Sequence, residues 1–236
     1  MFCQTNLSVQ REARMGETMK PIYFSYQQRL MPTALIVCLS IGLFQPVAGQ
    51  TIEARVAEIE KSGGWHMTKT RRVRKSSVKA GVVISLIPHP KEKLVSILRD
   101  YPNYPQLIHF LRSAKVLEEK SKTEHVLKFH AEILKGSVDL RAKLRATVVE
   151  SDPKKQIVRL EKLSGNLESM NAIFTLESVS DQQTLVTVDL HLDPDLWYVP
   201  DGTLTDYNQV NARRITRALK KKADSLTSKP VTDQSN

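Results

Sequence analysis

Apolar and polar residues alternate without interruption from Val138 to Val148. A period of two is typical of a β-strand that has one buried face and one solvated face. Short connections such as Lys135-Gly136 and Asp152-Pro153-Lys154 predict antiparallel hairpins on both sides of this strand. Six strands are therefore predicted in succession, at Ala114–Glu119, His125–Leu134, Val138–Val149, Gln156–Leu163, Ser169–Val179 and Thr184–Leu192.

Helices are predicted before and after this run of strands. The β-branched segment Ser77–Ile87 predicts a further strand, which Pro88 ends. A helix is expected at Lys91–Arg99; prolines then break it, and a second short helical piece is expected at Gln106–Leu111. One long helix is predicted at Leu204–Leu226, with an inward face made of Leu204, Tyr207, Ile215, Leu219 and Leu226.

The order of these elements is strand, two short helices, six strands and one long helix. It predicts an α+β fold, in which an antiparallel sheet packs against segregated helices. A sheet that curls around one long helix leaves a groove between them, and such a groove suits apolar molecules.

Residues 1–49 form a segment of a different kind. Basic residues precede an uncharged apolar run at residues 33–44, and the small residues Ala48 and Gly49 follow it. These features predict a secretory signal peptide that is cleaved after Gly49. The run is shorter than the roughly 20 residues of a spanning helix, and an uncleaved N-terminal anchor is the alternative. We therefore expect a periplasmic or secreted protein.

Removal of this leader changes the composition of the chain. Both cysteines, Cys3 and Cys38, lie in the leader, so neither a disulfide nor a cysteine metal site is expected in the mature protein. The formal net charge of +10 falls to about +8 when the four basic and two acidic leader residues are lost. A basic exported protein is expected to meet anionic membranes or cell-wall polymers rather than nucleic acid.

Residues 50–75 are predicted to form an amphipathic helix at Thr51–Lys61 and then a basic segment, Trp65–Lys75. The charges of this segment have two interpretations. They dock on anionic lipid or a partner, or they belong to a solvated edge strand and oppose aggregation. At the other end of the chain, residues 227–236 are polar, and disorder is predicted for them.

Three motifs of residues 76–226 resemble a known superfamily. Leu98–Pro105 resembles a helix break that precedes a strand, Ser164–Leu167 resembles a turn that leads to Phe174, and Pro194–Pro200 stands before the last helix. In this order they resemble the START-like helix-grip (SRPBCC) superfamily, closest to the polyketide cyclase and coenzyme Q-binding families. The resemblance implies a curved antiparallel sheet wrapped around a long C-terminal helix, with a cavity for a hydrophobic ligand between them.

Strand alternation, mapped onto this fold, gives a candidate cavity wall. Trp197 and Tyr198 lie on the loop that enters the last helix, where they are expected to gate the mouth. Tyr207 is expected to point from that helix toward the sheet. For each of these residues, plain core packing is the alternative. The inward-facing strand residues are Phe129, Leu140, Leu144, Leu160, Phe174, Val188 and Leu190.

The sequence contains no set of residues that is typical of an enzyme. It lacks the G-x-S-x-G, P-loop, H-E-x-x-H and G-x-G-x-x-G motifs. His125 and His130 are five residues apart on one predicted strand, so they face opposite sides and cannot share a metal ion. We expect no catalytic residue, metal or cofactor.

Three functional hypotheses follow. The first is an exported protein that holds a lipid, isoprenoid or quinone-like molecule in the cavity. The second is a basic module that docks on an anionic membrane or a protein partner through Arg71–Lys75, Arg141, Lys143, Arg145 and Lys220–Lys222. The third is a cyclase-like enzyme, which requires polar groups that the predicted inward faces lack.

Overall fold

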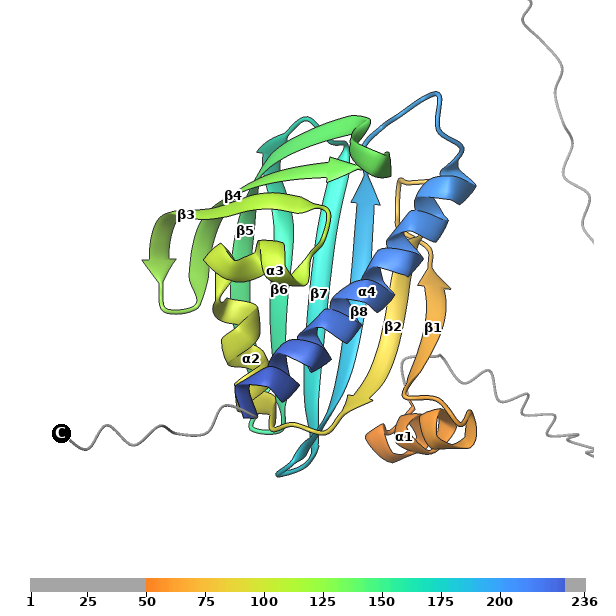
Figure 1. Ribbon diagram of the computed structural model, residues 1–236, viewed down its shortest axis with the longest axis vertical. Helices are drawn as coiled ribbons and strands as arrows, with labels where there is room; N and C mark the ends of the chain where they lie inside the picture. Colours follow the sequence, from red (N-terminus) through yellow and green to blue (C-terminus); the bar gives the residue numbers. More distant parts are fainter. Residues whose placement is uncertain (1–49, 228–236) are drawn as a thin grey trace, which may run out of the picture. The chain divides into compact units, whose positions relative to one another are not determined.

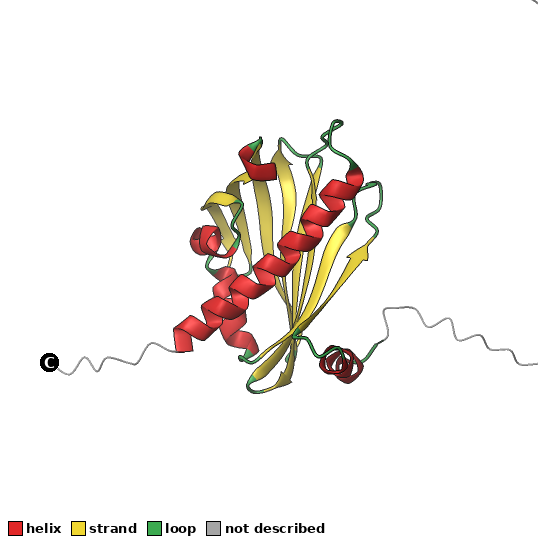
Figure 2. Ribbon diagram, turned by 45° about the vertical axis from the view of Figure 1, so that its right-hand side comes forward, coloured by secondary structure: helices red, strands yellow, loops and turns green. Residues whose placement is uncertain are grey.

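The computed structural model describes residues 50–227, so the predicted signal peptide and residues 228–236 lie outside it. This part of the chain forms a curved antiparallel sheet of eight strands, with helix α4 lying across its concave face (Figures 1 and 2). The strand order is β1-β2-β8-β7-β6-β5-β4-β3. The elements are α1 (Ile52–Lys61), β1 (His66–Arg71), β2 (Ala80–Ile87), α2 (Lys91–Arg99), η2 (Tyr101–Asn103), α3 (Tyr104–Leu107), β3 (Leu111–Ser121), β4 (Glu124–Ile133), η3 (Leu134–Gly136), β5 (Val138–Asp152), β6 (Lys155–Gly165), β7 (Ser169–Ser180), β8 (Gln183–Asp193) and α4 (Asp201–Thr227).

This architecture confirms the predicted α+β helix-grip fold. The six consecutive predicted strands are all present, as β3 to β8. The basic segment Trp65–Lys75 supplies β1, an edge strand of the sheet, as one of its two interpretations predicts. Because β1 pairs with β2 over its full length, residues 50–75 contribute a strand to the same sheet as residues 76–226.

The prediction of a second helical piece at Gln106–Leu111 is wrong in its position. The helical turns η2 and α3 begin earlier, and Leu111 already belongs to β3. Pro102 and Pro105 each lie at the start of one of these turns. The first N–H groups of a helix have no helical partner, so proline loses nothing there. These prolines therefore begin new helical turns as well as ending α2.

Helix α4 is seated on the sheet where β2 begins. A Cβ atom added to Gly81 would overlap the backbone of Gln209, so only glycine allows this approach of helix and strand. Beside it, the buried Asn208 amide donates to the carbonyl oxygens of Lys79 (3.1 Å) and Leu192 (3.2 Å). Its Oδ1 accepts the Leu192 N–H at 3.1 Å. Extended by two residues beyond Gly81 and Leu190, the register of β2 and β8 would pair Lys79 with Leu192, so the Asn208 side chain joins the two strands just past the end of their ladder.

The inner face of α4 follows the prediction except at its end. Leu204, Ile215 and Leu219 are buried and Tyr207 is half-buried. Leu226 is 48% exposed, because the buried face of the helix extends only to Ala223.

Helix α1 packs on the opposite, outer face of the sheet. Ile59 is its buried residue, and Arg55 forms an ion pair of 2.8 Å with Glu177 of β7. Glu177 also pairs with Lys155 of β6 at 3.4 Å, so its buried carboxylate is neutralised from two sides. Within residues 50–227, no helix is both long and apolar enough to cross a membrane.

Replacement of Asn208 tests the seat of α4. Asn208→Ala leaves the backbone groups of Lys79 and Leu192 buried without partners, so we expect the free energy of unfolding to fall by about 1–3 kcal/mol. Urea denaturation measures this loss. Gln209→Ala is the matched control, and we expect a change within about 0.5 kcal/mol because its side chain makes no hydrogen bond to another described residue. Equal losses in both variants would contradict the proposed role of Asn208.

Candidate functional site

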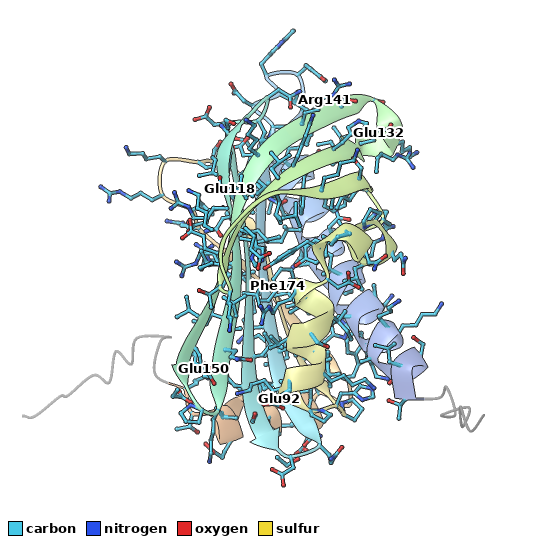
Figure 3. The ribbon with its side chains drawn as sticks, turned by 90° about the vertical axis from the view of Figure 1, so that its left-hand side faces the viewer. Glu92, Glu118, Glu132, Arg141, Glu150 and Phe174 are labelled. Atoms are coloured by element: carbon cyan, nitrogen blue, oxygen red, sulfur yellow. The ribbon has the colours of Figure 1, made fainter. Side chains whose placement is uncertain are left out.

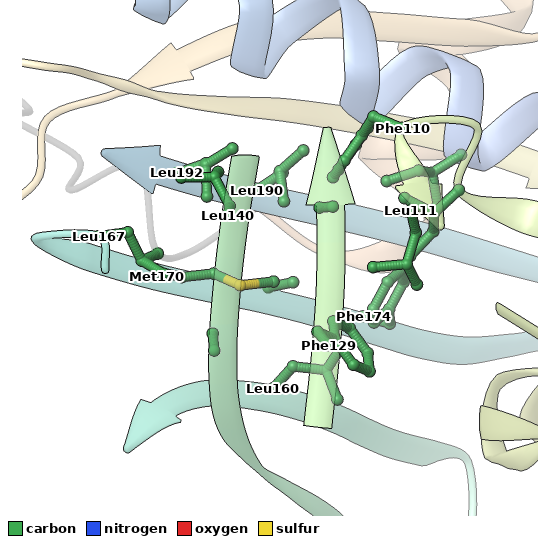
Figure 4. Close-up of a pocket in the computed structure, with 15 residues that line it drawn as sticks. Phe110, Leu111, Phe129, Leu140, Leu160, Leu167, Met170, Phe174, Leu190 and Leu192 are labelled. Atoms are coloured by element: carbon green, nitrogen blue, oxygen red, sulfur yellow. The ribbon is translucent and has the colours of Figure 1, made fainter. Parts of the chain in front are cut away.

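A small apolar cavity lies between the concave face of the sheet and α4 (Figure 4). Its wall is formed by strands β3 to β8, the segment before β3, the connection between β6 and β7 and one residue of α4, and every lining side chain is apolar. Its volume is about 30 Å³, which is close to the space of one water molecule. The lining residues are Ile108, Phe110, Leu111, Phe129, Ala131, Leu140, Ala142, Leu160, Leu167, Met170, Ala172, Phe174, Leu190, Leu192 and Ile215.

Alanines on the inner faces of three strands give the cavity its space. Ala142 stands opposite Phe129 and Ala131 stands opposite Leu140. Ala172 has Leu160 on one side and Leu190 on the other. Close packing needs large side chains to fill a curved sheet, and each alanine removes volume from that layer. Met170 adds an unbranched side chain that can adapt to an irregular space.

The structure brings five predicted wall residues together around the cavity. Phe129, Leu140, Leu160, Phe174 and Leu190 all line it. Leu144 and Val188 are fully buried on the same inner face but lie in the core beyond the cavity. For these two residues the alternative of plain core packing describes their position.

The two aromatic residues expected at the mouth are exposed. Trp197 is 93% exposed and Tyr198 is 58% exposed, and their rings contact each other with centroids 5.8 Å apart. Neither lines the cavity or the groove described below, so gating of the mouth by these residues stays a prediction. They belong to the connection that follows β8, where side-chain alternation no longer determines direction.

A larger open groove adjoins the cavity. Its volume is about 670 Å³, and it lies between α4, the segment His109–Arg112 and the turn Leu134–Gly136. Phe110 lines both spaces, so its ring stands between the groove and the cavity. Tyr207 lines the groove only, with its ring 6.0 Å from that of Phe110. Burial raises the pKa of Tyr207 to about 12, so its phenol stays neutral at physiological pH.

The rim of the groove is polar and charged. Arg112 pairs with Glu132 at 2.7 Å, and Arg214 Nη1 donates to His109 Nε2 at 2.8 Å. Burial and the positive charge of Arg214 lower the pKa of His109, which favours the neutral imidazole that accepts this hydrogen bond. An apolar interior behind a charged rim suits a molecule that enters with its apolar part first.

The apolar cavity wall offers no group that could transfer a proton or hold an ion. No side chain that lines it carries a titratable group. In residues 50–227 there is no cluster of three or more His, Cys, Asp or Glu side chains that could bind a metal. The arrangement is suited to hold an apolar molecule by contact. The absence of catalysis and of a cofactor stays a prediction.

Comparison with known families agrees with this geometry. A family model described as polyketide cyclase / dehydrase and lipid transport matches residues 87–220. The chain belongs to this family. The resemblance to the START-like helix-grip superfamily is thereby confirmed.

Solved structures share the fold at low sequence identity. A STAR-related lipid transfer protein from Xanthomonas axonopodis is 15% identical, with a TM-score of 0.60 over 68% of this chain and 94% of that one. Human StAR-related lipid transfer protein 5 is 9% identical, with a TM-score of 0.58 over 75% and 96%. A START superfamily protein from Mycobacterium smegmatis is 17% identical, with a TM-score of 0.50 over 61% and 97%. No curated protein matches the sequence.

A shorter side chain at position 110 tests the connection between groove and cavity. Phe110→Leu removes most of the ring that separates them, so we expect faster uptake of an apolar fluorescent dye such as Nile red, measured by stopped flow. Phe129→Leu is the control, because Phe129 lines the cavity without lining the groove. If both variants accelerate uptake equally, Phe110 is an ordinary wall residue.

Proposed function

We propose that this protein is a carrier that binds a hydrophobic small molecule between the sheet and α4. The observation that carries the proposal is the wholly apolar wall of the cavity. Membership of a family whose description includes lipid transport supports it. A lipid, isoprenoid or quinone-like molecule has the required chemistry.

Ligand binding in the apolar cavity requires the cavity to open into the groove. Ligand sites measure about 300–1,000 Å³, which the cavity of about 30 Å³ cannot provide and the groove of about 670 Å³ can. Rotation of Phe110 would connect them. Burial of roughly 300 Å² of apolar ligand surface at about 25 cal/mol per Å² contributes on the order of 7 kcal/mol before entropic costs. Few polar contacts are then needed for useful affinity.

We also propose that the carrier works outside the cytoplasm, in a periplasm or as a secreted protein. The positive flank, the short apolar run and the small residues before Gln50 support this location. The mature chain that would result contains no cysteine. It is therefore suited to an oxidising compartment without a need for disulfide formation.

The other two hypotheses find less support. A cyclase-like enzyme needs a polar group inside the cavity, and none of the lining side chains supplies one. The basic module was expected to combine Arg71, residues of β5 and the end of α4. Arg71 is held by Asp189 and Lys220 by Asp224, in separate parts of the fold. These ion pairs offset part of the positive charge that the hypothesis requires.

Native mass spectrometry tests the carrier function directly. The protein of residues 50–236 would be produced in a bacterial periplasm, weighed under native conditions and weighed again after denaturation. A discrete additional mass that is lost on denaturation is the expected result, and organic extraction identifies its chemical class. A protein that carries no additional mass, and that also fails to take up apolar dyes or lipids in vitro, would refute the proposal.

Filling the cavity should abolish ligand binding. Ala172→Leu places a larger side chain between Leu160 and Leu190, and we expect it to reduce bound ligand at least tenfold. Ala146→Leu is the control, because Ala146 is equally buried on the inner face of β5 but does not line the cavity. Both changes overpack the core and should lower the free energy of unfolding by about 1–3 kcal/mol. Ligand is quantified by native mass spectrometry, and similar ligand loss in both variants would show that overpacking alone is responsible.

A further inference from the structure

Three lysines face one another across neighbouring strands on the outer face of the sheet. Lys115 of β3 is paired in register with Lys128 of β4, and Lys128 is paired with Lys143 of β5. All three side chains are exposed. We call this row the lysine ladder.

The lysine ladder by itself lowers the stability of the folded protein. Like charges directly opposite each other on adjacent strands are destabilising. None of the three lysines forms an ion pair or a side-chain hydrogen bond with another residue of the described chain, in contrast to their basic neighbours. Arg145 lies 3.5 Å from Glu124, while His130 and Arg141 lie 2.7 Å and 3.0 Å from Asp139. The nearby acids are thus directed to other cations.

A shallow hollow lies at one end of the lysine ladder. Its volume is about 200 Å³, and it is lined by cationic or polar side chains alone: Ser113, Lys115, Lys128, His130 and Arg141. Strand spacing of about 4.8 Å places the three lysines along roughly 10 Å of the surface. Lys143 does not line the hollow, so the row of charge extends beyond it. Such an array fits a surface that carries many negative charges better than it fits one soluble anion.

We propose that the lysine ladder docks the protein on an anionic phospholipid membrane. Lysine ammonium groups are compact, hydrated point charges, which suit contact with headgroup phosphates without fixed bidentate geometry. Each lysine near such a membrane contributes about 1 kcal/mol. No apolar side chain needs to enter the bilayer for this contact.

The lysine ladder lies near the groove, and its role in ligand exchange rests on the proposed carrier function. Ser113 of the hollow follows Arg112 of the groove, and His130 of the hollow is two residues from Glu132 of the groove. Figure 3 labels Arg141 and Glu132 at the same end of the sheet. Contact through the lysine ladder would therefore hold the groove close to the membrane from which an apolar ligand is taken, or to which it is delivered.

Vesicle sedimentation tests the docking surface. The probe is phosphatidylcholine vesicles that contain phosphatidylglycerol, with pure phosphatidylcholine vesicles as reference. The triple variant Lys115→Gln, Lys128→Gln, Lys143→Gln should bind the anionic vesicles about 100-fold more weakly than the natural protein. The matched control replaces three other exposed lysines, Lys79, Lys154 and Lys221, by glutamine and has the same net charge. It should bind nearly as the natural protein does.

Several outcomes would overturn the inference. Equal losses in the two triple variants would mean that net charge alone drives binding. Failure of the natural protein to bind anionic vesicles, or binding of inorganic phosphate by the lysine ladder without vesicle binding, would exclude a membrane partner. Dye uptake measured without vesicles tests the carrier function separately. A protein that takes up dye but does not bind vesicles refutes only the docking surface. A protein that binds vesicles but takes up no dye refutes only the carrier function.

The stability of a single variant gives an independent test. Lys128→Gln removes both repulsive contacts of the lysine ladder, so we expect the Tm without vesicles to rise by about 1–4 °C. A lower Tm would show that Lys128 stabilises the sheet, and the ladder would then be a structural feature. Differential scanning calorimetry at low ionic strength measures the shift, which should shrink as salt screens the repulsion.

Discussion

The contact of α4 with the sheet at Gly81 and Asn208 determines where a space for a ligand can lie between helix and sheet. On the β2–β8 side, a glycine brings helix and strand backbones into contact, and one amide continues the ladder between the strands. The helix is therefore close to the sheet along that side. The groove lies beside the start of β3 and the end of β4, and strands β3 to β8 form the wall of the cavity. A close contact on one side and a curved sheet on the other produce the wedge that an apolar ligand would fill.

Much of the fold could be predicted because local sequence patterns determine its helices and strands. Alternation over β5 identifies a strand and its buried face without knowledge of any partner. The seat of α4 is a different kind of feature. Asn208 is 129 residues from Lys79, and in the sequence it is simply a polar residue on a helix. The first short helix lies where the sequence predicts it, at Lys91–Arg99, but the second does not. Proline can end one helix and begin another, and its neighbours decide which.

The candidate site shows the same limit. Alternation identifies the inner face of each strand, and it therefore predicts Phe129 and Phe174 as wall residues. It does not show how far along a strand the cavity extends, so it cannot separate Leu144 and Val188 from the residues that line the cavity. Inward alanines were the available signal for the empty space. Phe110 precedes β3 and has no alternation around it, so only the folded chain reveals its place between groove and cavity.

The fixed seat of the helix also decides which wall can move. Asn208 and Gly81 hold α4 against the sheet, so the helix is the fixed wall of the groove. The opposite wall has the features of a movable one: β3 is an edge strand whose register with β4 is interrupted three times. The adjoining turn holds Leu134 and Lys135 in the left-handed region, with φ of 51° and 60°. A larger ligand would thus be accommodated at the β3 edge of the sheet. Substitutions there could change the size of the cavity without disturbing the contact of α4 with Gly81.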